Sequence, residues 1–277
     1  MAQWPHIPSG WISRAAIDGG DDRRAVFARR RAGPFLISLC AYRSDFRQPA
    51  HEHDFAIVDL NLSGGGRGTC GRTEYLSRAG EVEFYPAGIG HSFTAGERGI
   101  RTMHVSLQRD PSEPHARGTE PTRHDQATLL RHALRTLRAV QEPQAWDELS
   151  VESACWELFA PPPGPIRTNH RAPTWLAQVL DVLHAHADRP VGLGELAGIA
   201  GVHRGALART FRSSTGRTVG DYHRRLRAAH AARRLAAGDP PTTASLEAGF
   251  ADQAHLGRWF KRELGVTPGQ FARLTRG

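Results

Sequence analysis

The chain has 277 residues, long enough for two domains with separate cores, and its formal net charge is +8. Its three cysteines lie far apart and fit ordinary thiols in a reducing cytosol, which argues against a disulfide framework. No apolar run approaches the length that spans a bilayer, and the N-terminus lacks a signal-like pattern, so we expect a cytoplasmic protein without membrane contact.

The charge is divided unevenly along the chain. Residues 166–277 contain 17 basic and 8 acidic residues, whereas residues 1–165 contain 19 and 20. A basic C-terminal third attached to a near-neutral body indicates that a polyanion binds that third only.

Residues 33–108 have the pattern of short strands. The segments 35–39, 56–62, 81–85 and 102–107 are mostly alternating and rich in β-formers, and glycine turns such as 64–66 separate them. Many short strands at close spacing predict an all-β barrel or sandwich.

Two histidine-bearing elements make this prediction more particular. His51-x-His53 precedes one strand, and a G-x5-P-x-G-x2-H element over residues 80–91 ends at His91. Together they resemble the cupin fold, a small jelly-roll barrel. The first element lacks the Glu that cupins usually carry, which leaves Asp59 as a displaced candidate, and Ala95 stands where an Asn is usual.

The resemblance implies a site built around His51, His53 and His91. In metal-binding cupins such histidines and the Glu hold a divalent cation, and three imidazoles alone could still hold Zn²⁺. The alternatives are an effector pocket and a purely structural role. We adopt the effector pocket and assign no metal or cofactor.

Two helices are expected after the barrel, within residues 123–160. The first, 127–140, carries Leu130, Leu134 and Leu137 on one stripe, and the second, 145–159, has Trp146, Leu149 and Trp156 as its large apolar residues. They either dock on their own barrel or form a homodimer contact through 123–159. We therefore expect a sensing or dimerising domain over 1–160 and a proline-rich linker over 161–172.

The C-terminal region contains an internal repeat at an offset of 49 residues, which indicates one supersecondary unit used twice. The matched pairs are Leu207/Leu256, Arg209/Arg258, Phe211/Phe260, Arg212/Lys261, Gly216/Gly265, Thr218/Thr267, Gly220/Gly269 and Tyr222/Phe271. Each copy predicts a short helix, a glycine-bearing turn and a longer Arg-bearing helix, which is the plan of a helix-turn-helix unit.

Local signals place the ends of these helices. Gly216 and Gly265 are left-handed stop signals, and Thr218 and Thr267 are candidate N-caps. Before the longer helices, Asp252 is a strong N-cap and the equivalent His203 is a poor one. Residues 218–237 predict one long Ala- and Arg-rich helix, a stiff spacer between the two units.

Residues 173–277 resemble the DNA-binding domain of the AraC/XylS family of transcription regulators, in which a cupin-like domain is a frequent N-terminal partner. The most specific match is A-G-F-x-D-Q-x-x-L-x-R-x-F-K-x3-G-x-T-P over 248–268, and Arg227, Ala231 and Leu235 match the linker-helix pattern. Two departures are Ala244-Ser245, where a bulkier aliphatic and Ala are usual, and Gly205 inside a reading helix.

The resemblance assigns DNA contacts to one set of positions in each unit. These are His203, Arg204, Gly205, Ala208 and Arg209 in the first, and Gln253, Ala254, His255, Gly257 and Arg258 in the second. Arg209 and Arg258 are the best candidates for base contact, because Arg pairs with guanine edges in the major groove.

We therefore predict a two-domain protein: a cupin-like jelly-roll barrel with two following helices, then an all-α domain of two helix-turn-helix units joined by a linker helix. Its expected function is sequence-specific regulation of transcription on double-stranded DNA, as an effector-responsive activator that contacts RNA polymerase. The alternatives are a constitutive DNA binder whose cupin-like domain only dimerises, and a metal-binding cupin enzyme with a DNA-binding tail. The missing Glu argues against the enzyme.

Overall fold

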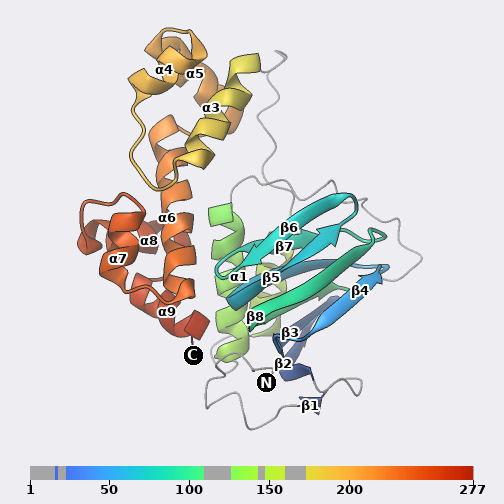
Figure 1. Ribbon diagram of the computed structural model, residues 1–277. Coiled ribbons are helices and arrows are strands. Elements are labelled where there is room, and N and C mark those ends of the chain that lie inside the picture. Colours follow the sequence, from blue (N-terminus) through green and yellow to red (C-terminus); the bar gives the residue numbers. More distant parts are fainter. Residues whose placement is uncertain (1–15, 18–22, 109–125, 143–146, 160–172, 277) are drawn as a thin grey trace.

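A computed structural model describes residues 16–17, 23–108, 126–142, 147–159 and 173–276 (Figure 1). The expected linker 161–172 and Trp146 lie outside the described residues. The strands of the N-terminal part are β1 (Ala16–Ile17), β2 (Arg24–Ala32), β3 (Phe35–Tyr42), β4 (Arg47–His51), β5 (Ala56–Cys70), β6 (Thr73–Arg78), β7 (Val82–Tyr85) and β8 (His91–Leu107).

These strands form one curled antiparallel sheet, here called the β-domain, in the order β1-β2-β3-β8-β5-β6. The two long strands change partners along their length. β5 pairs with β7 and then β6, while β8 pairs with β4 and then β3, and bulges interrupt the β5–β8 register. Bulges bend and twist a strand, which lets the sheet curl into the expected cupin-like fold.

The sequence prediction for β5 was wrong at its glycines. Residues 64–66 were expected to form a turn, but they lie within β5. A Cβ atom on Gly66 would lie 2.3 Å from the Thr94 carbonyl oxygen, and one on Gly68 would lie 2.2 Å from that of Ser92. These glycines therefore allow close approach of β8 in a bent strand, which explains why a strand contains them.

The helices are α1 (Gln126–Gln141), α2 (Glu148–Phe159), α3 (Thr174–Ala185), α4 (Leu193–Ala200), α5 (Arg204–Thr215), α6 (Val219–Ala237), α7 (Pro241–Glu247), α8 (Gln253–Leu264) and α9 (Pro268–Arg276). We call α3–α5 unit 1 and α7–α9 unit 2. Figure 1 shows α6 running between the two units, with α1 standing between unit 2 and the sheet. No helix of the described ranges is long and apolar enough to cross a membrane.

Most of the expected helix ends are confirmed. Gly216 and Gly265 adopt φ values of 72° and 76° at the C-caps of α5 and α8. The Thr218 hydroxyl accepts a hydrogen bond from the Asp221 amide at 3.1 Å. Thr267 and Gln270 form a reciprocal capping box at α9, with bonds of 2.8 and 3.2 Å.

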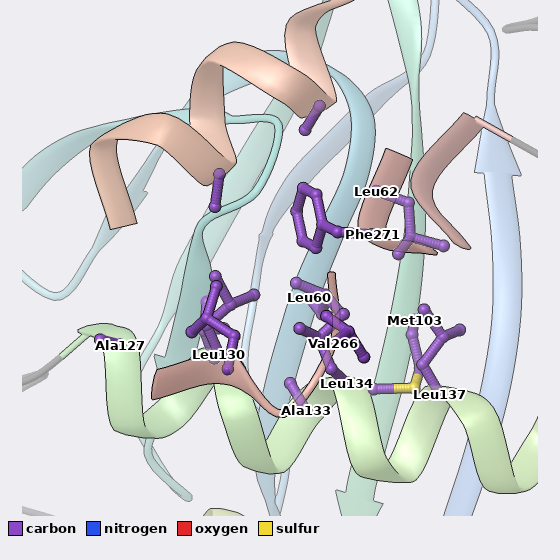
Figure 2. Close-up of a cluster of buried hydrophobic side chains, with 14 of the residues drawn as sticks. Leu60, Leu62, Met103, Ala127, Leu130, Ala133, Leu134, Leu137, Val266 and Phe271 are labelled. Carbon is purple, nitrogen blue, oxygen red and sulfur yellow. The ribbon is translucent and has the colours of Figure 1, made fainter. Parts of the chain in front are cut away.

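The two units are buried in different ways. Unit 1 has its own core, centred on Val179, Leu183, Leu196, Leu207 and Phe211. The core of unit 2 is continuous with that of the β-domain through α1. In Figure 2, Val266 and Phe271 of unit 2 meet Leu130 and Leu134 of α1 and Leu60 of β5. The leucine stripe of α1 is thus covered within the chain.

Candidate nucleic-acid interface and ligand cavity

The ten predicted DNA-contacting residues lie at the beginnings of α5 and α8, where His203 directly precedes α5. All ten are exposed or half-buried, and Arg204, Arg209, Gln253 and Arg258 are exposed. The opposite faces of the two helices are buried through Leu207 and Phe211, and through Leu256 and Phe260. Packing therefore holds each helix from one side and leaves the predicted reading side open.

The start of α5 differs from its prediction. His203, expected to be a poor cap, caps the helix: its Nδ1 accepts a hydrogen bond from the Gly205 amide at 3.2 Å. An imidazole nitrogen can accept just as a carboxylate oxygen does, and this bond leaves the proton on Nε2, which faces away from the backbone. Asp252 caps α8 as expected, accepting from the His255 amide at 2.6 Å.

Packing among the described residues does not require glycine at two positions of the reading helices, Gly205 and Gly257. A Cβ atom on Gly205 would make ordinary contacts, the shortest being 3.4 Å to His203 Nδ1, and one on Gly257 would meet nothing within 4 Å. Glycine in a helix interior costs about 1 kcal/mol relative to Ala. Both positions would let a partner approach the helix backbone closely.

A junction under α6 fixes the second reading helix. Arg227 of α6 is buried, donates from Nε to the Ala248 carbonyl at 2.8 Å and from Nη2 to the Gly249 carbonyl, and lies 4.5 Å from the Phe250 ring. Gly249 has a φ of 69°, and a Cβ atom there would lie 2.8 Å from the Asp188 carbonyl. The α7–α8 turn of unit 2 thus rests on the α3–α4 loop of unit 1.

Helix α6 also contacts unit 1, one helical turn before Arg227. His223 is buried and its Nε2 donates to the His186 carbonyl at 2.9 Å, at the end of α3. Burial lowers the pKa of His223, which keeps the ring neutral. The linker helix therefore binds main-chain carbonyls of both units. These hydrogen bonds, together with the stiffness of the helix, set the relative placement of the units.

The β-domain holds a partly open cavity of about 220 Å³. Its lining is mixed but rich in hydrogen-bonding groups. These polar residues are Arg24, Arg29, Ser38, Tyr42, Gln48, His53, Asp59, Asn61, Tyr75, Glu83, Tyr85, His91, Thr102, His104, Ser106 and Gln108. The size suits a small molecule, and the lining suits a polar one.

The three predicted histidines gather at one place. His53 and His91 line the cavity, and the His51 ring lies 4.7 and 4.3 Å from theirs, measured between centroids. His51 and His91 donate from Nδ1 to the carbonyls of Pro49 and Ile89 at 3.0 and 3.1 Å. These bonds leave Nε2 of each ring clear of the backbone, and Nε2 of His51 lies 3.0 Å from Gln48 Nε2 and 3.2 Å from His53 Nε2.

This cluster fits a divalent cation. One ring nitrogen from each of the three histidines lies within 4.8 Å of the others, and carbonyl-bonded Nδ1 atoms are the usual support of metal-binding imidazoles. Burial lowers the pKa values of His53 and His91, which favours the neutral rings that bind metals. Asp59, the displaced candidate, does not join this cluster: its Oδ1 bonds Nδ1 of His104 instead.

Two polar networks line the rest of the cavity. Tyr42 bonds His104 Nε2 at 2.8 Å, and the Asp59 carboxylate raises the pKa of His104 well above its usual value against the opposing effect of burial. On the other side the Tyr85 hydroxyl bonds Tyr75 at 2.8 Å and Glu83 at 2.9 Å. Burial raises the pKa of Glu83 to about 7.

Two cavity-lining acceptors are left without a hydrogen-bond partner among the described residues: Asn61 Oδ1 and Glu83 Oε1. A buried acceptor without a partner costs about 1–3 kcal/mol. A ligand that donates hydrogen bonds would remove that cost. Sequence reasoning missed these residues, although the polar alternation of Thr102, His104 and Ser106 was a signal for a polar inner face.

Comparison with known proteins agrees with both halves of the structure. Residues 31–159 match the AraC-like ligand binding domain, and residues 196–274 match a helix-turn-helix domain. The regulator GlxA of Rhizobium meliloti is 35% identical over 108 residues, which are 38% of this chain and 32% of that protein. The activator RhaR of Klebsiella pneumoniae is 33% identical over 106 residues, 36% of each.

Among solved structures, an AraC-type transcriptional regulator from Chromobacterium violaceum is 22% identical, with a TM-score of 0.35, over 36% of this chain and 91% of that one. The chain spans about a third of the length of the curated relatives it matches. The two matched domains adjoin in one chain in the order that the cupin-like sheet and the tandem helix-turn-helix units have here. The chain belongs to the AraC/XylS family of transcription regulators.

Proposed function

We propose that the chain is a sequence-specific, effector-responsive transcription activator that acts in the cytoplasm. Its α5 and α8 would enter successive major grooves of one duplex. Arg209 and Arg258 would contact base edges, with weaker contributions from Arg204, Gln253 and His255. The single observation that carries this proposal is the exposure of one matched face on each reading helix, with the opposite face buried.

The basic charge of the C-terminal third supports a phosphate-binding surface around these faces. Replacement of condensed cations by Arg side chains makes such binding strongly salt-dependent. Retention of the full chain on double-stranded DNA should fall steeply between low and high salt, and a random duplex should be released at lower salt than a selected duplex, because non-specific binding is almost wholly electrostatic. Salt-independent retention, or none on any duplex, would reject the proposal.

The effector would bind in the cavity beside His51, His53 and His91. The unsatisfied acceptor Asn61 Oδ1 supports a ligand that donates hydrogen bonds, and Glu83 Oε1 could accept a hydrogen bond or, when protonated, donate one. Replacing the three histidines with Ala should abolish the transcriptional response and leave DNA affinity intact. An unaltered response would show that the cluster takes no part in sensing.

The metal-bound form stays a second candidate for this site, because the ring nitrogens converge. Elemental analysis of the purified protein would decide between the metal-bound and metal-free forms.

A dimer contact is proposed for α2 alone, since Leu149 and Trp156 lie seven residues apart on it and remain 72% and 40% exposed. RNA polymerase is the partner expected of an activator.

A further inference from the structure

The β-domain and unit 2 share a buried face that unit 1 does not share. Strand residues Leu62 and Met103, helix residue Leu137 and unit 2 residues Phe260 and Phe271 belong to one continuous core. Figure 2 shows Phe271 directed into this cluster between the strands and α1. The units therefore differ in their relation to the β-domain, although their sequences repeat.

A buried arginine joins the two parts at this face. Arg101 of β8 has no exposed surface, and its Nη2 donates to the Thr275 carbonyl of α9 at 2.6 Å. Carbonyls of a last helical turn lack intrahelical partners and carry partial negative charge, so they suit a cation. Burial lowers the pKa of Arg101 to about 10.

A second contact places the β-domain on the linker helix. Gly80, in the turn between β6 and β7, has a φ of 81°, and a Cβ atom there would lie 3.1 Å from Cα of Arg233 and 3.2 Å from the carbonyl carbon of Ala232. The neighbouring Glu81 pairs with Arg233 at 3.7 Å. The absence of a side chain on Gly80 lets the turn come this close to the backbone of α6.

A third contact runs through α1. Arg225 of α6 donates to the Thr128 hydroxyl of α1 and pairs at 2.9 Å with Glu263 of α8, and both members of the pair are nearly buried. An ion pair of this kind is costly to break, because each partner would be left charged in a buried site. These contacts link α1, the linker helix and the second reading helix.

The strands behind this face are also the wall of the cavity. Along β8, Ile100, Thr102 and His104 line the cavity, while Arg101 and Met103 face unit 2. The same alternation holds along β5, where Asp59 and Asn61 line the cavity and Leu60 belongs to the shared core. Successive side chains of a strand point to opposite faces, so a single layer of backbone separates the cavity from unit 2.

We propose that this docked face is the route by which the β-domain acts on DNA binding, and that it acts on unit 2 alone. The predicted reading side of α8 stays exposed, so docking braces the helix and does not cover it. An occupant that shifts β8 would move Arg101 together with Thr102, and thereby α9. This inference rests on the proposed function, since it takes the cavity as the sensing site and α8 as a DNA reader.

The test uses the full chain with two docking variants and a matched control for each. Arg101→Gln removes the cation at α9, and Arg98→Gln makes the same change at an exposed position of β8. Gly80→Ala presses a methyl group onto α6. Gly71→Ala imposes a similar positive-φ strain, but its nearest contact is an ordinary 3.6 Å.

Two readouts are compared: hydrogen exchange in α5 and α9, and affinity for a duplex that the wild-type chain selects from a random pool. The docking variants should speed exchange in α9 and leave α5 unchanged. They should also bind the selected duplex about 5- to 150-fold more weakly, the usual range of intramolecular coupling. The half-site read by α8 is the one at which Arg258→Ala loses sequence preference. Randomising that half-site should remove the loss of affinity in the docking variants. Both control variants should bind as the wild-type chain does.

The proposal is overturned if the docking variants keep wild-type affinity, or if their loss persists when the half-site of α8 is randomised. If Arg101→Gln shows no cooperative unfolding and is therefore not properly folded, the result for Gly80→Ala decides whether the proposal holds. A wild-type chain that selects no duplex would refute the proposed function. Unchanged α9 exchange in both docking variants would refute the docked face itself.

Discussion

Two exposed guanidinium groups, those of Arg209 and Arg258, occupy equivalent positions of the two reading helices. Arg258→Ala should weaken binding to the selected duplex by about 1–3 kcal/mol, because a bidentate contact to guanine would be lost. Binding to random DNA should change little. Titrations of both duplexes measure the difference, with Arg98→Ala on the β-domain as the control. Equal losses on the two duplexes would mean that Arg258 contacts only phosphates.

Gly257 separates helix stability from DNA contact. It lies inside α8 with open space around it, as Gly198 lies inside α4. Ala at either position should raise the free energy of unfolding by about 0.5–1 kcal/mol. Only Gly257→Ala should weaken binding to the selected duplex, since a methyl group there would stand between helix and groove. Similar DNA affinity for both variants would place Gly257 outside the interface.

Glu83 should make stability depend on pH. Its pKa is raised to about 7, so the folded chain holds this proton more tightly than the unfolded chain does. The free energy of unfolding should therefore fall as pH rises from the usual glutamate range to about 7, and Glu83→Gln should remove that fall. Denaturant titrations across this range, with the exposed Glu74→Gln as control, measure it. Identical slopes for wild type and Glu83→Gln would contradict the assignment.

At single residues, the sequence predicted the histidine cluster but little of the cavity around it. The meeting of His51, His53 and His91 could be predicted because these residues carry a known sequence pattern. Tyr42, Asp59 and His104 meet because the register of β3, β5 and β8 brings them together, and no local pattern encodes register across 45 residues. His203 was misjudged because cap preferences rank residue types and do not consider the ring tautomer.

At the scale of elements, the linker helix is more than a spacer, because Arg227 binds two carbonyls of the α7–α8 turn. Arg227→Met should lower the free energy of unfolding by about 1–3 kcal/mol, as buried acceptors lose their donor. It should also relax the preferred spacing between half-sites, whereas Arg234→Met on the same helix should not. Spacing libraries measure this. A variant that is less stable yet keeps the wild-type spacing preference would show that Arg227 does not position the units.

The helices were more predictable than the strands. Periodicity, glycine stops and threonine caps are local signals, so they predicted the positions of α5, α6, α8 and α9 closely. β5 and β8 were predicted too short because their glycines look like turns. Those glycines are required by the close approach of the two strands, which is a tertiary property.

At the scale of the molecule, the asymmetry between the units could not be read from the repeat. The leucine stripe of α1 predicted a buried face, but not that Phe271 of unit 2 would share it with the β-domain. One consequence concerns the isolated C-terminal part. Without the β-domain it would expose apolar surface on unit 2, so the full chain is the form in which DNA binding should be tested.

In the proposed complex, two reading helices held by one linker helix bind the same duplex. The most direct measurement is the affinity of the full chain for its selected duplex before and after about half a helical turn, roughly 5 bp, is inserted between the half-sites. The insertion places the half-sites on opposite faces of the DNA, and we expect the affinity to fall to that of a single half-site. Unchanged affinity after the insertion would show that the two helices do not bind the duplex together.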